Sequence, residues 1–277
     1  MLFSFVALLT FLVAIVSAGN VASTCKQAGH VALTFDQGPG IGTGRVLDVL
    51  SRRNIPATFH ISADLLRNGT LRAYVKRAAL EGHTIGIYMP DLGGTIQDSE
   101  LQSNDTDFQL YQNIVKSSNW VSSLIGRQPV YIRFGRKAIP QATRRLIDSM
   151  GLIATRPKID IRDENNKLDS IWGSVHKGFN TTSASEHSFI VKMRDMMPNM
   201  GASLDRMIDY IESRGFIIVP MEQCNPMPDK LVAMLASRIK KDIKSSPNFG
   251  STSSAAKSAP SLMLLAAILC LLAASWQ

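Results

Sequence analysis

An aspartate and a histidine stand at the ends of the first two short apolar runs of the chain. Asp36 directly follows the apolar run 30–35, and His60 lies in the next run, 57–61. A carboxylate so placed can act as a general base. A single imidazole is not a metal site, because a metal needs three or more convergent ligands. No set of His, Asp and Ser has the spacing of a known nucleophile motif.

Strand and helix patterns alternate along the chain. Short apolar runs bounded by Gly or Pro indicate strands, and longer stretches have the helical period. We expect strands over residues 30–35, 57–61, 83–87, 131–134, 188–193 and 216–220, and helices over 45–53, 65–81, 108–125, 141–150 and 204–214. This alternation predicts an α/β fold with parallel strands. Reactive groups of parallel barrels lie just past the carboxyl ends of the strands, where Asp36 and His60 are found.

Length and composition agree with one large domain plus processing segments. The chain has 277 residues, of which 45% are hydrophobic and 19% charged, with no internal repeat. This composition excludes a collagen-like, disordered or multi-span membrane protein. The net charge of +8 comes from scattered basic residues, so we expect a solvated basic surface and no nucleic-acid partner.

Both ends of the chain carry apolar segments. Residues 1–18 hold an apolar run and end in small residues before an expected cleavage after Ala18, which is typical of a secretory signal peptide. The segment lacks a basic start, so an uncleaved anchor is an open alternative. Residues 246–277 form a polar spacer and a short apolar tail, which predicts a glycosylphosphatidylinositol (GPI) signal, with a single membrane helix as the alternative. Residues 19–245 are expected to be the domain between them.

In a secreted chain, cysteines can form disulfides and Asn-X-Thr triplets can be glycosylated. Cys270 lies in the removable tail, which leaves Cys25 and Cys224 as the pair in the domain. An even count in a secreted chain predicts a disulfide, with two buried free thiols as the alternative. Three triplets are candidate N-glycosylation sites, and they begin at Asn68, Asn104 and Asn180.

Several short motifs resemble those of the polysaccharide deacetylase family, which includes chitin deacetylases. They are residues 34–39 (TFDQGP), 57–59 (ATF), 82–86 (GHTIG) and 215–219 (GFIIV), the last shortly before Cys224. The resemblance implies a distorted (β/α) barrel and removal of acetyl groups from N-acetylglucosamine polymers with a metal such as zinc or cobalt. In that family an aspartate and two histidines hold the metal, a second aspartate is the general base, and a late histidine is the general acid.

The resemblance also implies that the metal ligands are replaced in this chain. Asp36 stands at the general base, and Gln37 stands at the metal-binding aspartate. Tyr88 and Met89 stand at the two histidines, on a loop shorter than that of the family. An amide, a phenol and a thioether are weak ligands for zinc or cobalt. We therefore expect no metal cofactor.

The remaining positions of the implied site are basic and acidic. Arg133 matches the arginine that orients the base, and Arg194 replaces the acid histidine. Asp160 and Asp163 stand where the family has an aspartate motif that tethers the arginine and the acid, although ordinary loop acids would look the same. An arginine keeps its proton at any relevant pH and cannot act as a general acid.

These replacements predict a catalytically inactive, deacetylase-like glycoprotein at the cell surface or cell wall, anchored to the outer face of the plasma membrane. Its cleft, framed by Asp36, Tyr88, Arg133 and Arg194, would bind a chitin-like glycan or another coat component. Two alternatives stay open. One is an active, divergent N-acetylglucosamine polymer deacetylase that uses Asp36 and His60, and the other is a purely structural coat protein.

Overall fold

The computed structural model describes residues 21–90, 103–135, 139–161, 168–229 and the four residues 232, 233, 236 and 237. Contacts divide the chain into residues 1–232, which include every strand described below, and residues 233–277. The segments predicted to be processed, 1–18 and 246–277, lie outside the described residues, as do Asp163 and Cys270. Among the described residues, no helix is long and apolar enough to cross a membrane.

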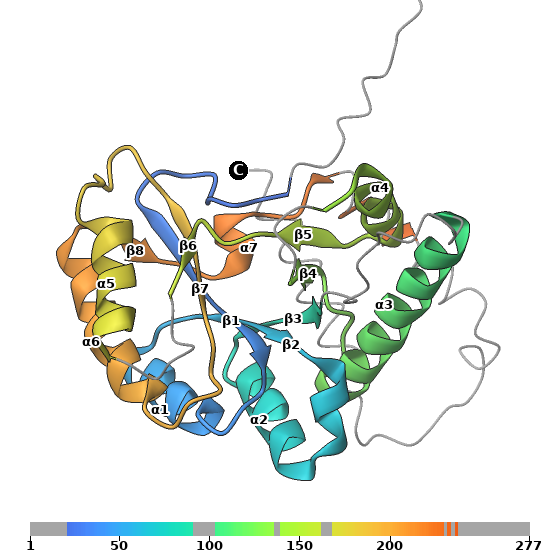
Figure 1. Ribbon diagram of the computed structural model, residues 1–277, viewed down its shortest axis with the longest axis horizontal. Coiled ribbons are helices and arrows are strands. Elements are labelled where there is room, and N and C mark those ends of the chain that lie inside the picture. The colour runs from blue at the N-terminus through green and yellow to red at the C-terminus, as the bar shows by residue number, and fades with distance from the viewer. Residues whose placement is uncertain are drawn as a thin grey trace, which may run out of the picture. The chain divides into compact units, whose positions relative to one another are not determined.

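A curled sheet of parallel strands forms the centre of the fold (Figure 1). The order of its described strands is β5-β4-β3-β2-β1-β7-β6, and β8 also pairs with β1. Their bounds are β1 (His30–Gly38), β2 (Thr58–Ile61), β3 (Thr84–Met89), β4 (Tyr131–Phe134), β5 (Ile153–Thr155), β6 (Ile159–Asp160), β7 (Phe189–Met193) and β8 (Ile217–Ile218). The predicted α/β fold with a distorted barrel is confirmed.

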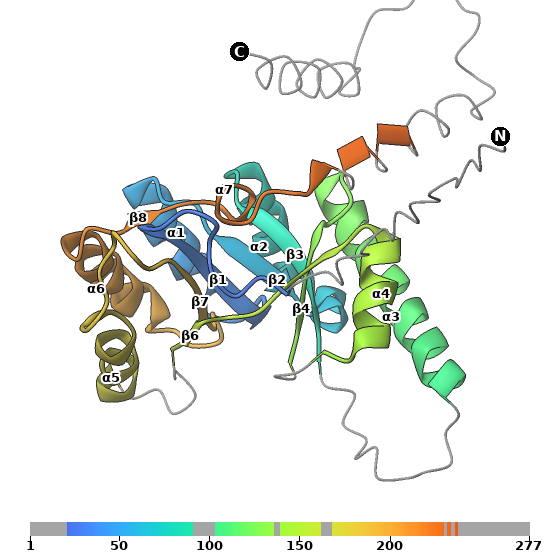
Figure 2. The same cartoon turned by 90° about the horizontal axis from the view of Figure 1, so that it is seen from above.

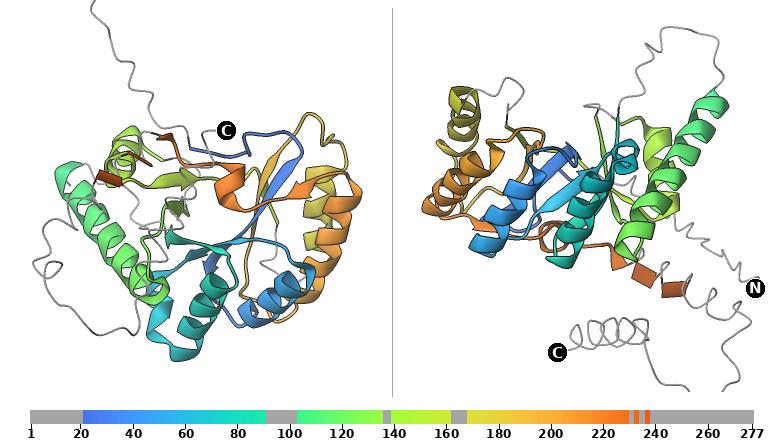
Figure 3. Two further views of the ribbon diagram at one scale, coloured as in Figure 1. Left: turned by 180° about the vertical axis from the view of Figure 1, so that it is seen from behind. Right: turned by 90° about the horizontal axis from the view of Figure 1, so that it is seen from below.

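Helices cover the outer face of this sheet. In Figure 2 the pair α5 and α6 lies on one side of β1 to β3, and the pair α3 and α4 lies on the other. Figure 3 shows the same arrangement from behind and from below. The helices are α1 (Thr43–Arg53), η1 (Ala63–Arg67, a 3-10 helix), α2 (Gly69–Leu80), α3 (Ser103–Ile125), α4 (Gln141–Met150), α5 (Leu168–Phe179), α6 (Met200–Ser213) and α7 (Met221–Cys224).

Local chemistry explains where the elements differ from the sequence prediction. The single helix expected over 65–81 is divided into η1 and α2 at Asn68, whose side-chain oxygen accepts hydrogen bonds from the backbone of Thr70 and Leu71 at 2.9 and 3.2 Å. Such a cap begins a new helix. Strands β5 and β6 were not predicted because runs of two or three residues show no periodicity. Helix α5 was missed as well, and its two glycines weaken the helical pattern.

Side chains of the strands alternate between an outer and an inner core. On β1, Val31, Leu33 and Phe35 belong to the large cluster that includes buried residues of the helices. Ala32, on the other face, belongs to a smaller inner cluster with Tyr131 and Ile190. Two positions after Ala32, Tyr131 and Ile190 on their strands stand three polar residues, Thr34, Arg133 and Lys192. A polar layer therefore lies above this inner core, toward the carboxyl ends of the strands.

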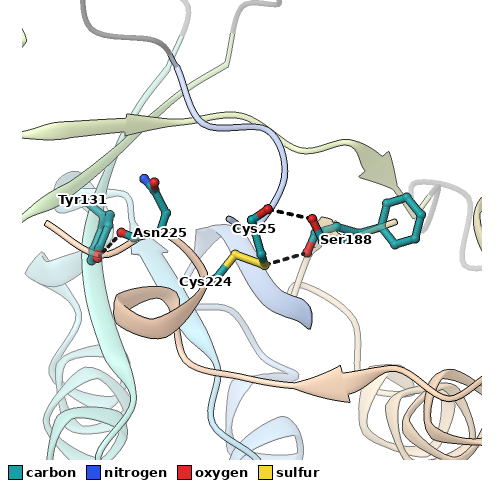
Figure 4. Close-up of a disulfide and its surroundings, with 6 residues drawn as sticks. Cys25, Tyr131, Ser188, Cys224 and Asn225 are labelled. Carbon is teal, nitrogen blue, oxygen red and sulfur yellow. Dashed lines mark hydrogen bonds between the residues drawn. A yellow bond between two sulfur atoms is a disulfide. The ribbon is translucent and has the colours of Figure 1, made fainter. Parts of the chain in front are cut away.

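The disulfide closes the amino-terminal end of the inner core. Cys25 and Cys224 are bonded, 199 residues apart in sequence, with their Cα atoms 4.3 Å apart. Figure 4 shows the hydrogen bonds beside them, in which Ser188 Oγ donates to the carbonyl of Cys25 at 2.7 Å and Tyr131 Oη donates to the carbonyl of Asn225 at 3.0 Å. The predicted pairing is confirmed.

Candidate functional site

Four polar side chains meet inside the barrel at the carboxyl ends of β1, β2, β4 and β5. The register pairs Asp36 with His60 and Arg133 with Thr155 across neighbouring strands. All four side chains are buried, and Asp36 and Arg133 are each 1% exposed. The sequence placed Asp36 and Arg133 in one site and offered His60 as an option. Thr155 was missed because its strand was not predicted.

The carboxylate of Asp36 has a partner on each oxygen. His60 Nδ1 lies 2.9 Å from Oδ1, and Arg133 Nη1 donates to Oδ2 at 3.1 Å. The guanidinium also donates from Nε to Thr155 Oγ1 at 3.1 Å and from Nη2 to Thr34 Oγ1 at 3.4 Å. This network holds the carboxylate rigidly against the barrel wall.

Burial and charge determine the protonation states of this network. Burial alone would raise the pKa of Asp36, but Arg133 and then His60 outweigh it, and the pKa lies below its ordinary value. Burial, assisted by Arg133, lowers the pKa of His60. At neutral pH Asp36 is therefore an anion beside a neutral imidazole. Donation from His60 Nδ1 to Asp36 leaves Nε2 to accept from the hydroxyl of Thr155, 3.3 Å away.

A glycine on β3 makes room for the imidazole. Gly86 is the register partner of His60 on β3. A Cβ at Gly86 would lie 2.9 Å from His60 Cδ2 and 2.7 Å from the carbonyl oxygen of Tyr131. The contact of His60 with Asp36 therefore depends on a glycine in the neighbouring strand.

Gln37 and Tyr88 meet beside this network. Gln37 Nε2 donates to Tyr88 Oη at 2.9 Å, so two of the positions that the sequence assigned to lost metal ligands are in direct contact. Met89, the third position, follows Tyr88 on the strand and packs into the outer core. Successive strand residues point to opposite faces, which explains the difference.

These side chains do not fit a zinc or cobalt ion. They supply one amide, which is hydrogen-bonded to a phenol, and the adjacent carboxylate of Asp36 is paired with the cation of Arg133. Among the described residues, no three His, Cys, Asp or Glu side chains gather in a group that could hold a metal. A divalent ion in an oxygen and nitrogen site prefers carboxylate and imidazole ligands.

Asp160 and Arg194 lie at the edge of the same site. Asp160 Oδ2 accepts from Lys192 Nζ at 2.8 Å, on the neighbouring strand β7. Asp160 and Arg194 both line a pocket of about 430 Å³ with Asp36 and Arg133, which we call the arginine pocket. The structure thus brings these two sequence-predicted positions to the site, and it shows a lysine partner for Asp160 that the sequence did not indicate.

Asp195 is a further buried carboxyl group, just past β7. Burial raises its pKa to about 6. Thr43 Oγ1 donates to its Oδ2 at 2.5 Å, and Oδ1 has no hydrogen-bond partner in the described part of the chain. A Cβ on Gly38 would overlap this carboxyl group, so the loop that follows β1 lies directly on Asp195. The Asp195 carboxyl group therefore gains or loses its proton near pH 6.

A second pocket lies on the other side of the Gln37–Tyr88 pair. It has a volume of about 460 Å³ and is lined by one face of α3 together with Met89 and residues of η1. We call it the α3 pocket. Gln37 and Tyr88 line both pockets, so their hydrogen bond stands between the two.

Known proteins share this fold and part of this sequence. The Polysaccharide deacetylase family model matches residues 23–154. The chitin deacetylase of Colletotrichum lindemuthianum is 27% identical over 219 residues, which are 76% of this chain and 84% of that protein. Its structure superposes with a TM-score of 0.65 at 25% identity, over 74% of this chain and 91% of that chain.

Two further similar proteins come from bacteria. The peptidoglycan-N-acetylglucosamine deacetylase PgdA of Listeria monocytogenes is 28% identical over 203 residues, which are 72% of this chain and 39% of that enzyme. A pseudoenzyme of the CE4 family from Bacillus anthracis shares the fold with a TM-score of 0.58 at 15% identity, over 71% of this chain and 65% of that chain.

Proposed function

Because the chain belongs to the polysaccharide deacetylase family, we propose that it is a non-catalytic member that binds glycan at the cell surface. The observation that carries this proposal is the pairing of both carboxylate oxygens of Asp36, the residue at the general-base position. Its carboxylate is 1% exposed and has His60 on one oxygen and Arg133 on the other.

A carboxylate with both oxygens paired and a lowered pKa is a poor general base. Proton abstraction requires a lone pair within reach of the substrate and a pKa near the working pH. Asp36 is buried, and Arg133 and His60 keep its pKa below the ordinary value. In this chain the Asp36 carboxylate links β1 to β2 and β4 through its contacts with His60 and Arg133.

The other parts of the family mechanism are replaced as well. The pair Gln37 and Tyr88 is a weak donor set for a divalent cation, and Arg194 at the acid position cannot release a proton. Without Lewis-acid polarisation and protonation of the leaving amine, several kcal/mol of transition-state stabilisation are absent, and about 1.4 kcal/mol corresponds to tenfold in rate. We therefore propose that the chain has neither a metal cofactor nor deacetylase activity.

Acetate release tests the loss of catalysis. The secreted chain is incubated with N-acetylglucosamine oligomers in the presence of zinc or cobalt, and its metal content is measured after gel filtration. We expect no turnover and no stoichiometric metal. Gln37→Asp should not restore turnover, because Tyr88 and Arg194 are unchanged. Stoichiometric metal together with turnover would overturn the proposal, and loss of that turnover in Asp36→Asn would support the active alternative.

Glycan binding is supported by the retained pockets and by the names of the relatives. The two relatives of highest identity reported above are a chitin deacetylase and a peptidoglycan-N-acetylglucosamine deacetylase. Calorimetric titration with N-acetylglucosamine oligomers should show binding without hydrolysis. Absence of binding, together with capture of a coat protein, would favour the purely structural alternative.

Surface anchoring and glycosylation complete the proposal. The signal peptide and the GPI tail are proposed from the sequence patterns of the two ends. Asn68 and Asn180 are exposed, as glycan attachment requires, whereas the side chain of Asn104 is outside the described residues. Phosphatidylinositol-specific phospholipase C should release the protein from intact cells, and a peptide N-glycosidase should reduce its mass. Retention on cells after the lipase would support the single membrane helix instead.

A further inference from the structure

We propose that an uncharged N-acetylhexosamine chain binds in the α3 pocket, with Trp120 as the platform under a sugar ring, and not over Asp36 and Arg133. This inference rests on the glycan-binding part of the proposed function and assigns it to one pocket. Four features of the structure support it: the face of α3, the position of Trp120, the opposite wall and the charge of the two pockets.

One face of α3 is polar and aromatic where it lines the pocket. Asn113, Lys116, Ser117 and Trp120 all line it, and their spacing of three and four residues places them on one side of the helix. Ile114 and Val121 are fully buried in the outer core. Core packing therefore accounts for the other stripe of α3. On the pocket face, Trp120 is partly buried against the same core and also lines the pocket.

Trp120 can support a sugar ring. The C–H face of a pyranose is apolar and packs on an aromatic ring, while its hydroxyl groups bond to polar neighbours. Lys116 Nζ lies 5.8 Å from the centre of the Trp120 ring. Lys116 is exposed, and such a contact is weak in water, so an arriving ring can displace it and still accept its hydrogen bonds.

The opposite wall of the pocket suits a neutral polyol with an amide. Gln37 and Tyr88 present an amide and a phenol there, and Ser62 adds a hydroxyl group. Met196, which is 42% exposed, and Leu65 complete an apolar lip. The volume of about 460 Å³ is within the range of small-ligand sites.

The charge of the two pockets decides between them. Among the described residues that line the α3 pocket, only Asp64 and Lys116 are charged. The described lining of the arginine pocket contains six charged side chains: Asp36, Arg133, Arg156, Asp160, Lys192 and Arg194. A neutral sugar over these charges would displace their water without offering a counter-charge, which is unfavourable. A neutral glycan is therefore expected in the α3 pocket.

Calorimetric titration with the N-acetylglucosamine pentamer tests the assignment. Trp120→Leu keeps apolar volume against the core but removes the aromatic platform, and we expect a loss of affinity of about tenfold or more, as for a central aromatic contact. Trp120→Phe should retain most of the affinity. Equal binding by Trp120→Leu and the wild type would overturn the proposal.

A matched pair on α3 keeps the test decisive if Trp120 variants fold poorly. Ser117→Arg places a bulky side chain in the pocket and should abolish binding, whereas Asn119→Arg, at an exposed position outside both pocket linings, should not change it. Lys192→Met, in the arginine pocket, should also bind like the wild type. Normal binding by Ser117→Arg, or a loss confined to Lys192→Met, would move the glycan to the other pocket. No binding by the wild type would instead refute glycan binding as a whole.

Discussion

Replacement of Arg133 by methionine tests the buried ion pair between Asp36 and Arg133. Asp36 and Arg133 are each 1% exposed, and Arg133 Nη1 donates to Asp36 Oδ2 at 3.1 Å. Removing one partner of such a pair leaves an uncompensated buried charge, which costs about 3–5 kcal/mol. We expect Arg133→Met to lose about this much free energy of unfolding at pH 7, a large part of the ~5–15 kcal/mol of a typical domain.

The stability difference between Arg133→Met and the wild type should depend on pH. In the wild type the folded pKa of Asp36 is depressed, so its stabilisation is present above the unfolded pKa and is lost as the pH falls through the folded pKa. In Arg133→Met the cation is gone and burial raises the pKa of Asp36. The carboxyl group then takes up a proton as the pH falls from neutrality, and the difference from the wild type should shrink between about pH 7 and pH 5.

Urea unfolding followed by tryptophan fluorescence, at several pH values from 8 to 5, measures this difference. The double variant Asp36→Asn/Arg133→Met should lose less stability than Arg133→Met alone, because no charge is left unpaired. Arg133→Lys should lie between the wild type and Arg133→Met. A loss that is independent of pH and equal in the single and double variants would refute the reasoning.

Three further substitutions test other contacts of the fold. Gly86→Ala should lower the free energy of unfolding by about 1–3 kcal/mol, because its Cβ would meet the neighbouring imidazole and backbone at 2.9 and 2.7 Å; unchanged urea midpoints would contradict this. Cys25→Ser/Cys224→Ser should cost about 2–4 kcal/mol, and mass spectrometry of the wild type without reductant should find no free thiol in the domain. Asp195 has a folded pKa of about 6 against an ordinary value of 3.8, so its protonated form stabilises the fold below pH 4 and that contribution is lost as the pH rises toward 6. The free energy of unfolding of Asp195→Asn minus that of the wild type should therefore be larger at pH 7 than at pH 4, by about 3 kcal/mol at most. The same difference at both pH values would show that Asp195 does not titrate in this range.

Much of the fold follows from local patterns. Strands β1, β2 and β4 are apolar runs close to the predicted ranges, and α4 has the predicted bounds. The disulfide between Cys25 and Cys224 also followed from the sequence, since only two cysteines lie outside the apolar tail. The short strands β5 and β6 did not, because pairing with β4 and β7, and not their own sequence, makes them strands.

Residue types and their order predict polar side chains at the ends of the strands, and they place an amide and a phenol, Gln37 and Tyr88, at positions that the family resemblance assigns to metal ligands. Parallel strands bring their carboxyl ends to one edge, so proximity could be inferred without coordinates. Only the tertiary structure decided that His60 forms a hydrogen bond with one oxygen of Asp36 and that Met89 packs in the outer core. Both outcomes depend on strand register and on the face to which each side chain points, and these are set by pairing between distant segments.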